Sequence, residues 1–591
     1  MRHFIQVLKL LLLTVILLYG SFSQIQAQKK NNKNPSKEEI QDQESTNRAA
    51  EFYFIEGEKF YILEDYAKAL GSFQKCLDFT PENSAVYYMI AKILLINEQY
   101  DQAETNILKS IEFEPDNKYY YLTATEIFTA RGDFEKAAEY FEKMIDNVPN
   151  TEEYYLELAG LYLYQNMLDE ALETYIRAEK SFGIVENISF QKQQIYLRQN
   201  KIDEAISTGQ DLVDTYPGEE RYIISLAEVM HANNRTDESL NLLESYLNDY
   251  GGNTRVKILL SEYYRQEGKF EESSSLIKEA FKDPYLNSEG KIQILINYIA
   301  NFPDPNYVDL AKELGEILMV VHPDDGDSYL VNADMLTELV TSSDVENEKG
   351  LREKAAGYYY KSLEFNPSKF TVWQNLLNIE FQLGKWEVLT THAEEALELF
   401  PNNALVYLFA GVGHSRKKDY EKAIDYYEQG RKMASDPQLL NNFYTSLGDA
   451  YNASKDYVNS DKNYELALSL NPDDDIVLNN YSYYLSLRKE KLDKARQMSL
   501  ATVRRNPENS SFLDTYAWIL YQLKEYDEAK RILEKAIAIQ ATNAVYYDHY
   551  GDVLYKLGDT NGAVESWQKA KELDKELKDI DKKIAERKIY E

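Results

Sequence analysis

The chain has 591 residues, too many for one compact core, so several domains or a repeat array are expected. Hydrophobic residues make up 44% and charged residues 28%, a balance that excludes a wholly disordered chain. Asp and Glu outnumber Lys and Arg by 99 to 65, a formal charge of −34, and no long basic stretch is present, so nucleic acid is a poor candidate for a partner.

Residues 1–27 have the composition of a secretory signal peptide. Basic Arg2 and Lys9 stand before or at the start of a short apolar run over residues 10–19. Small residues follow, and cleavage after Ser23 satisfies the small-x-small rule through Ser21, with cleavage after Ala27 as the rival. The run is too short for a comfortable membrane span, so we expect an exported chain with no integral span after cleavage. An uncleaved N-terminal anchor in the inner membrane is the alternative.

Residues 28–49 are polar and show no apolar periodicity. Such a segment buries too little apolar surface to fold alone, so we interpret it as a flexible polar leader. The folded body is therefore predicted to begin at residue 50.

The main signal in the remaining sequence is a period of 34 residues. Small residues recur at this step over seven positions: Ala69, Ala103, Ala137, Ala171, Ala205, Ser239 and Ser273. Prolines follow the same step: Pro81, Pro115, Pro149 and, two periods later, Pro217. A fixed period of this length predicts a stack of identical supersecondary units.

Residues 118–149 illustrate how one unit is read. Tyr121 and Phe128 fall on one face of a helix, and Gly132 then favours a left-handed helix end. A second helix carries Ala137, where a small side chain allows the two helices to cross closely. Proline at the unit's end cannot donate the next helical hydrogen bond. Units often restart with Pro-x-Asn, and asparagine is a good helix N-cap.

These features resemble the tetratricopeptide repeat (TPR) family, most closely in residues 441–472 and 544–570. The resemblance covers residues 50–574 and about fifteen units. It implies an all-α fold, a right-handed α-solenoid of helix-turn-helix units. It also implies a surface that holds proteins or peptides, and the chain resembles exported TPR proteins of bacterial envelopes.

The register predicts how the chain is divided. An N-terminal array covers 50–284, and a C-terminal array covers 352–574. Between them, 285–351 is an irregular repeat-like segment with prolines and an inserted polar run. It is either a hinge or a set of loop insertions in one continuous superhelix. Residues 575–591 are more polar than any inner helix and are predicted to form a C-terminal capping helix.

No pattern in the sequence indicates a catalytic, cofactor or metal site. The histidines are never spaced as helical metal ligands, and His414 and His549 fall on first helices, where we interpret them as packed or exposed side chains. The acidic runs 324–327 and 473–475 follow prolines and fit helix N-termini better than a calcium loop. We therefore predict a non-enzyme that needs no cofactor.

The partner site is predicted on the concave face of the C-terminal units, which first helices line in this family. Seven residues fall on the groove-facing positions: Tyr483, Asp514, Trp518, Tyr521, Asp548, Asp552 and Tyr555. The four aromatic residues would form a ladder of rings and the three acids would add polar anchors. Alternatively, Trp518 and Tyr521 simply pack between adjacent first helices.

The function predicted from these observations is a periplasmic scaffold of the bacterial cell envelope that binds protein or peptide partners. Association with a membrane complex stays open. A regulator or adaptor of an envelope enzyme, such as a hydrolase or protease, or of a secretion machine is the alternative.

Overall fold

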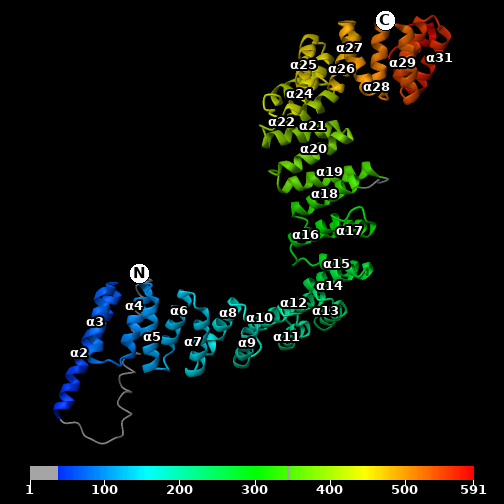
Figure 1. Cartoon of the computed structure of the whole chain (residues 1–591). Coiled ribbons are helices and arrows are strands. Elements are labelled where there is room, and N and C mark those ends of the chain that lie inside the picture. The colour runs from blue at the N-terminus through cyan, green and yellow to red at the C-terminus, as the bar shows by residue number, and fades with distance from the viewer. Residues whose placement is uncertain (1–36, 343–346, 591) are drawn as a thin grey trace. The chain divides into compact units, whose positions relative to one another are not determined.

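The computed structural model describes residues 37–342 and 347–590 (Figure 1). Every regular element in those ranges is a helix, and helices α2 to α31 follow one another as fifteen consecutive helix pairs. The predicted all-α solenoid of about fifteen TPR-like units is therefore confirmed. The predicted signal peptide and the leader up to residue 36 lie outside the described residues.

The chain divides into two compact units, residues 1–256 and 257–591, and α14 (Thr254–Gln266) begins at their boundary. The first unit holds α2 (Lys37–Ile62), α3 (Tyr66–Phe79), α4 (Ser84–Ile96), α5 (Tyr100–Phe113), α6 (Lys118–Arg131), α7 (Phe134–Asn147), α8 (Tyr155–Tyr164), α9 (Leu168–Phe182), α10 (Glu186–Arg198), α11 (Ile202–Thr215), α12 (Glu220–Ala232) and α13 (Thr236–Tyr250).

The second unit continues with α15 (Phe270–Phe281), α16 (Ser288–Ile299), α17 (Pro305–Val321), α18 (Gly326–Ser342), α19 (Glu348–Phe365), α20 (Phe370–Leu383), α21 (Trp386–Leu399), α22 (Ala404–Arg416), α23 (Tyr420–Gly430), α24 (Pro437–Ala453), α25 (Tyr457–Leu470), α26 (Asp475–Arg488), α27 (Leu492–Arg505), α28 (Ser510–Gln522), α29 (Tyr526–Ile539), α30 (Ala544–Lys556), α31 (Thr560–Leu573) and α32 (Ile580–Glu586).

Local sequence sets the helix ends, as the repeat pattern predicts. In four Pro-x-Asn junctions the asparagine side chain accepts a hydrogen bond from a backbone N–H of the first turn that follows: Asn83, Asn117, Asn403 and Asn509. These bonds satisfy donors that a helix leaves unpaired at its start. Gly132 ends α6 with a φ of 82°, the left-handed conformation expected from its position.

Within a pair, a glycine of the first helix makes room for a large ring sixteen residues later in the second. Gly551 faces Trp567, and a Cβ added at Gly551 would lie 2.5 Å from the indole ring. The same relationship recurs in three other pairs: Gly57 with Phe73, Gly411 with Tyr427 and Gly448 with Tyr464. These rings are all buried, so each pair fills its own core through one close contact.

First helices of neighbouring pairs also contact one another. In the second unit α20, α22, α24, α26, α28 and α30 approach each other in succession, with Cα atoms within 8 Å. A stack whose first helices lie this close presents them together on one surface, which we call the inner face. At α15 and α17 it is instead the second helices that meet.

The structure differs from the predicted boundaries in three places. Helix α2 begins at Lys37, so residues 37–49 are helical and not a flexible leader. Their Glu, Gln, Lys, Arg and Ala residues favour helix, and the packed helix beyond residue 50 extends through them. The C-terminal cap is a helix only over 580–586, after a turn. The segment 285–351 contains α16 to α18 and the start of α19, all in the second unit.

Candidate partner-binding face

The predicted site residues lie on three consecutive first helices, as the register requires. Tyr483 lies on α26, then Asp514, Trp518 and Tyr521 on α28, and Asp548, Asp552 and Tyr555 on α30. Three of them are buried: Asp514, Tyr521 and Asp552. The other four are partly exposed: Tyr483, Trp518, Asp548 and Tyr555. Only these four therefore offer surface that a partner can reach.

Trp518 is part of a stack of rings that joins two first helices. Its centroid lies 4.7 Å from that of Tyr521, with planes 9° apart, and 4.1 Å from that of His549 on α30, with planes 20° apart. The indole Nε1 is buried without a hydrogen-bond partner among the described residues. The geometry matches the alternative interpretation, in which Trp518 packs between adjacent first helices.

Asp514 is engaged by the same histidine. Its Oδ1 lies 2.8 Å from Nδ1 of His549, and both side chains are about one-tenth exposed. Burial alone would lower the pKa of His549, but the carboxylate of Asp514 and the nearby Asp548 and Asp552 raise it above its usual value. A charged imidazole is therefore favoured inside the stack, where it bridges α28 and α30.

Asp548 and Asp552 are engaged by the C-terminal cap. Nζ of Lys583 on α32 lies 2.8 Å from an oxygen of each carboxylate. The indole of Trp567 donates a further bond of 2.9 Å to Asp552. Burial raises the pKa of Asp552, although Lys583 opposes that rise. The two acids thus hold the cap in place.

His549 and Lys583 occupy the same position of successive units, because they are 34 residues apart. Each lies 35 residues after the aspartate that it contacts, Asp514 or Asp548. Each also contacts the residue 31 positions before it, Trp518 or Asp552. The sequence interpretation missed both basic residues as members of this face. Aligning the units on the 34-residue register would have placed them there.

The remaining two aromatic residues contact rings of their own units. Tyr483 lies 5.9 Å from Tyr484 between centroids, and Tyr555 lies 6.1 Å from Trp567. The described contacts therefore bring together Trp518 and Tyr521 of the proposed ladder, with His549 as an added ring. Tyr483 and Tyr555 leave part of their surface open on the inner face.

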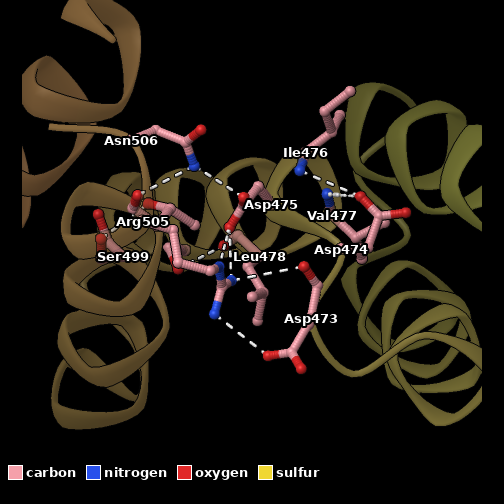
Figure 2. Close-up of polar contacts among 11 residues, drawn as sticks. Asp473, Asp474, Asp475, Ile476, Val477, Leu478, Ser499, Arg505 and Asn506 are labelled. Carbon is pink, nitrogen blue, oxygen red and sulfur yellow. Dashed lines mark hydrogen bonds and ion pairs between the residues drawn. The ribbon is translucent and has the colours of Figure 1, made fainter. Parts of the chain in front are cut away.

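The acidic run 473–475 has a structural role in the second unit (Figure 2). Asp474 caps α26 by accepting bonds of 3.1 and 3.2 Å from the backbone of Ile476 and Val477. Arg505 bridges the other two: its Nη1 lies 3.1 Å from Asp473 and its Nε lies 2.8 Å from Asp475. The interpretation of this run as helix N-terminal acids agrees with these contacts.

A hollow of about 620 Å³ is lined mostly by residues of α15 and α17. Arg265 and Tyr307 line it, and Nη1 of Arg265 donates a 2.6 Å bond to the Tyr307 hydroxyl. Glu262 accepts a hydrogen bond of 3.0 Å from the same guanidinium, so the charge of Arg265 is already matched.

In the described ranges, no three His, Cys, Asp or Glu side chains gather where they could hold a metal ion. Nor does any helix there have the length and apolar character of a membrane span.

Models of the tetratricopeptide repeat match four segments of the chain: 72–105, 119–151, 442–474 and 511–543. The chain therefore contains tetratricopeptide repeats in both compact units. Proteins built of these repeats generally mediate protein–protein interactions and act as scaffolds.

Three similar proteins illustrate the range of relatives. A TPR repeat-containing protein of Methanocaldococcus jannaschii is 25% identical over 278 residues, 39% of this chain and 49% of that protein. The BBSome complex member BBS4 of Bos taurus is 25% identical over 37% of this chain and 42% of its own length. Anaphase-promoting complex subunit 3 of Schizosaccharomyces pombe is 28% identical over 14% and 12%. The chain spans about half or less of the length of these relatives.

Two solved structures align along most of the chain. The Cut9 and Hcn1 hetero-tetramer of the APC/C is 12% identical, covers 91% of this chain and 96% of that chain, and has a TM-score of 0.36. Yeast Tom70 is 13% identical, covers 92% and 95%, and has a TM-score of 0.28.

Proposed function

We propose that the chain is a non-catalytic scaffold of the bacterial cell envelope, exported to the periplasm, which holds protein or peptide partners on the inner face of its second unit. The observation that carries this proposal is the unbroken succession of first helices from α20 to α30. An extended segment of a partner can follow such a surface across several units, which is how repeat arrays bind their targets.

The side chains of this face suit a protein partner. Tyr483, Trp518 and Tyr555 are partly exposed on consecutive first helices. Aromatic residues contribute large contact areas at low entropic cost and are frequent hot spots in interfaces. Two of the relatives are named as members of multi-protein complexes, one of the BBSome and one of the anaphase-promoting complex. Both points support a role in assembling other proteins.

Site-specific photo-crosslinking in the native cell tests where partners bind. A photoreactive residue replaces Tyr483 or Tyr555 on the inner face, and Val458 on the second helix α25, which is 81% exposed, is the matched control. We expect the two inner positions to capture the same protein and the control position to miss it. Equal capture at Val458 would contradict the choice of face.

Export is tested separately, by sequencing the N-terminus of the chain recovered from a periplasmic extract. We expect Gln24 or Gln28 as the first residue, because cleavage follows Ser23 or Ala27. Recovery of Met1 in the membrane fraction would favour the anchored alternative.

A further inference from the structure

The first helix of the array, α2, carries an exposed apolar stripe, and at the position of Phe52 the next two first helices are buried. Phe52, Ile55 and Leu63 are 60%, 57% and 63% exposed. Phe52 and Ile55 share one side of α2 with Lys59, which lies seven residues after Phe52, and Leu63 lies in the turn directly after the helix. Ile62, 58% exposed, borders the same stripe.

The 34-residue register shows what normally covers this side. The positions equivalent to Phe52 in the next two pairs are Val86 and Tyr120, which are 0% and 4% exposed. Those residues lie on α4 and α6, which pack against the second helix of the preceding pair, α3 and α5 respectively. Among the described residues no helix pair precedes α2.

Helix α2 is also longer than the helix α3 on which it packs. It has 26 residues, whereas the helices from α3 to α7 have 13 or 14, and it runs back to Lys37 beyond the buried Ala50. A helical extension gains most of its stability from packing on another element and little from propensity. An exposed apolar stripe on such a helix is typical of a surface that another helix covers.

We propose that a second copy of this chain covers the stripe, through an antiparallel pairing of the two α2 helices. The charges on α2 favour this occupant. Glu51 and Lys59 lie four residues on either side of Ile55, and both are exposed. When two α2 helices cross at Ile55, Lys59 of each copy meets Glu51 of the other, and the apolar residues meet across the twofold axis.

At the C-terminal end of the array, the last helix pair is already covered, which disfavours a head-to-tail arrangement of two copies. Helix α32 covers the last pair, with Ile580 only 1% and Lys583 only 6% exposed. A copy stacking its α2 there would have to displace the Lys583 ion pairs. The open surface at α2 therefore pairs with its own equivalent, which gives a closed dimer and not a filament.

Sedimentation of the full chain over a range of concentrations at about 0.15 M salt tests this pairing, since salt at that level screens the general repulsion between acidic chains. We expect a reversible dimer whose dissociation constant rises at least tenfold with Ile55→Glu. The control Val458→Glu changes an apolar residue on α25 that is more exposed than Ile55, 81% against 57%, and should leave the dimer unchanged. Circular dichroism should stay the same in both variants.

Charge reversal identifies the partner surface. Glu51→Lys and Lys59→Glu should each weaken the dimer at least threefold, and the double variant should restore it, because both intermolecular pairs re-form with reversed sign. A chain that stays monomeric, as it would if residues 1–36 or lipid covered the stripe, overturns the proposal. The proposal is also overturned if Ile55→Glu leaves the dissociation constant of the dimer unchanged. It is overturned as well if the double variant dimerises more weakly than either single variant.

Discussion

Nδ1 of His549 lies 2.8 Å from Oδ1 of Asp514, and this buried contact joins the first helices of successive units. One unit later Lys583 contacts Asp548 in the same relative position, and both contacts span 35 residues. The period of the repeat is 34, so each contact ties one unit to the next. The last units are therefore held together by polar pairs as well as by apolar packing.

The first prediction concerns the pH dependence of that contact. Although burial opposes it, Asp514 raises the pKa of His549 in the folded chain above the usual value of 6.5. The stability that the pair contributes is therefore complete below pH 6.5 and is lost as the pH rises through the higher, folded pKa. We expect hydrogen exchange in α28 and α30 to accelerate from pH 6 to 8.5 beyond its intrinsic rate.

The variant His549→Gln isolates this effect, because every other titrating group is shared with the parent chain. The extra protection at low pH should disappear in His549→Gln and in Asp514→Asn. His231→Gln in the first unit serves as the control and should leave α28 and α30 as they are. An unchanged pH profile in His549→Gln would show that the pair does not stabilise this region.

A second prediction concerns the cap. Removing Lys583 leaves Asp552, whose side chain is 8% exposed, without its cation. Breaking a buried ion pair from one side typically costs about 3–5 kcal/mol, so Lys583→Ala should release α32 and expose α30 and α31 to hydrogen exchange. The neighbouring Lys582, 64% exposed and paired with Asp579, is the matched control. Lys582→Ala should cost less than about 1 kcal/mol.

Equal effects of the Lys582 and Lys583 substitutions would mean that α32 is held by its apolar residues alone. The exchange measurement resolves this outcome because it reports each helix separately.

A third prediction uses two glycines in helices of the second unit. A Cβ at Gly551 would lie 2.5 Å from Trp567, so Gly551→Ala forces a buried ring to move and should cost about 1–3 kcal/mol. At Gly357 in α19 an added Cβ meets nothing within 4 Å, so Gly357→Ala should stabilise by about 0.5–1 kcal/mol through helix propensity. Urea unfolding of both variants measures the difference. If both substitutions changed the free energy of unfolding in the same direction, the packing role of Gly551 would be contradicted.

Much of this fold could be predicted from the sequence because its determinants are local and periodic. The 34-residue step fixes which residues face each other, and a single Asn or Gly sets the end of several helices. The positions of Asn83, Asn509 and Gly132 follow from such local rules, and the structure places them as helix caps.

Contacts between units were harder to predict, because they depend on which side chain reaches across. Periodicity placed Trp518 and Asp552 on one surface, but their partners His549 and Lys583 lie 31 residues further on, on the next helices of this face and on the cap. The start of α2 was also missed, because a polar composition resembles a leader unless a packed helix continues through it. Hydrophobic pattern alone contains no such information.

The final prediction separates the two interpretations of Trp518. The indole is stacked against Tyr521 and His549 and is partly buried, so its removal takes away the ring that packs on both of them. Trp518→Ala should therefore cost about 3 kcal/mol of local stability, comparable to other large-to-small changes in a packed cluster. Trp518→Phe keeps an aromatic ring in the stack and should lose less than half of that amount.

Partner capture by the crosslinkable residue at Tyr483, measured at low temperature where both variants remain folded, provides the second readout. If Trp518 also contacts the partner, Trp518→Ala should weaken capture by about 2 kcal/mol, as expected for an aromatic hot spot, beyond any effect of Trp518→Phe. Unchanged capture together with the loss of stability would assign Trp518 wholly to the packing of α28 on α30. The binding surface would then be confined to the exposed parts of Tyr483, Tyr555 and their neighbours on the inner face.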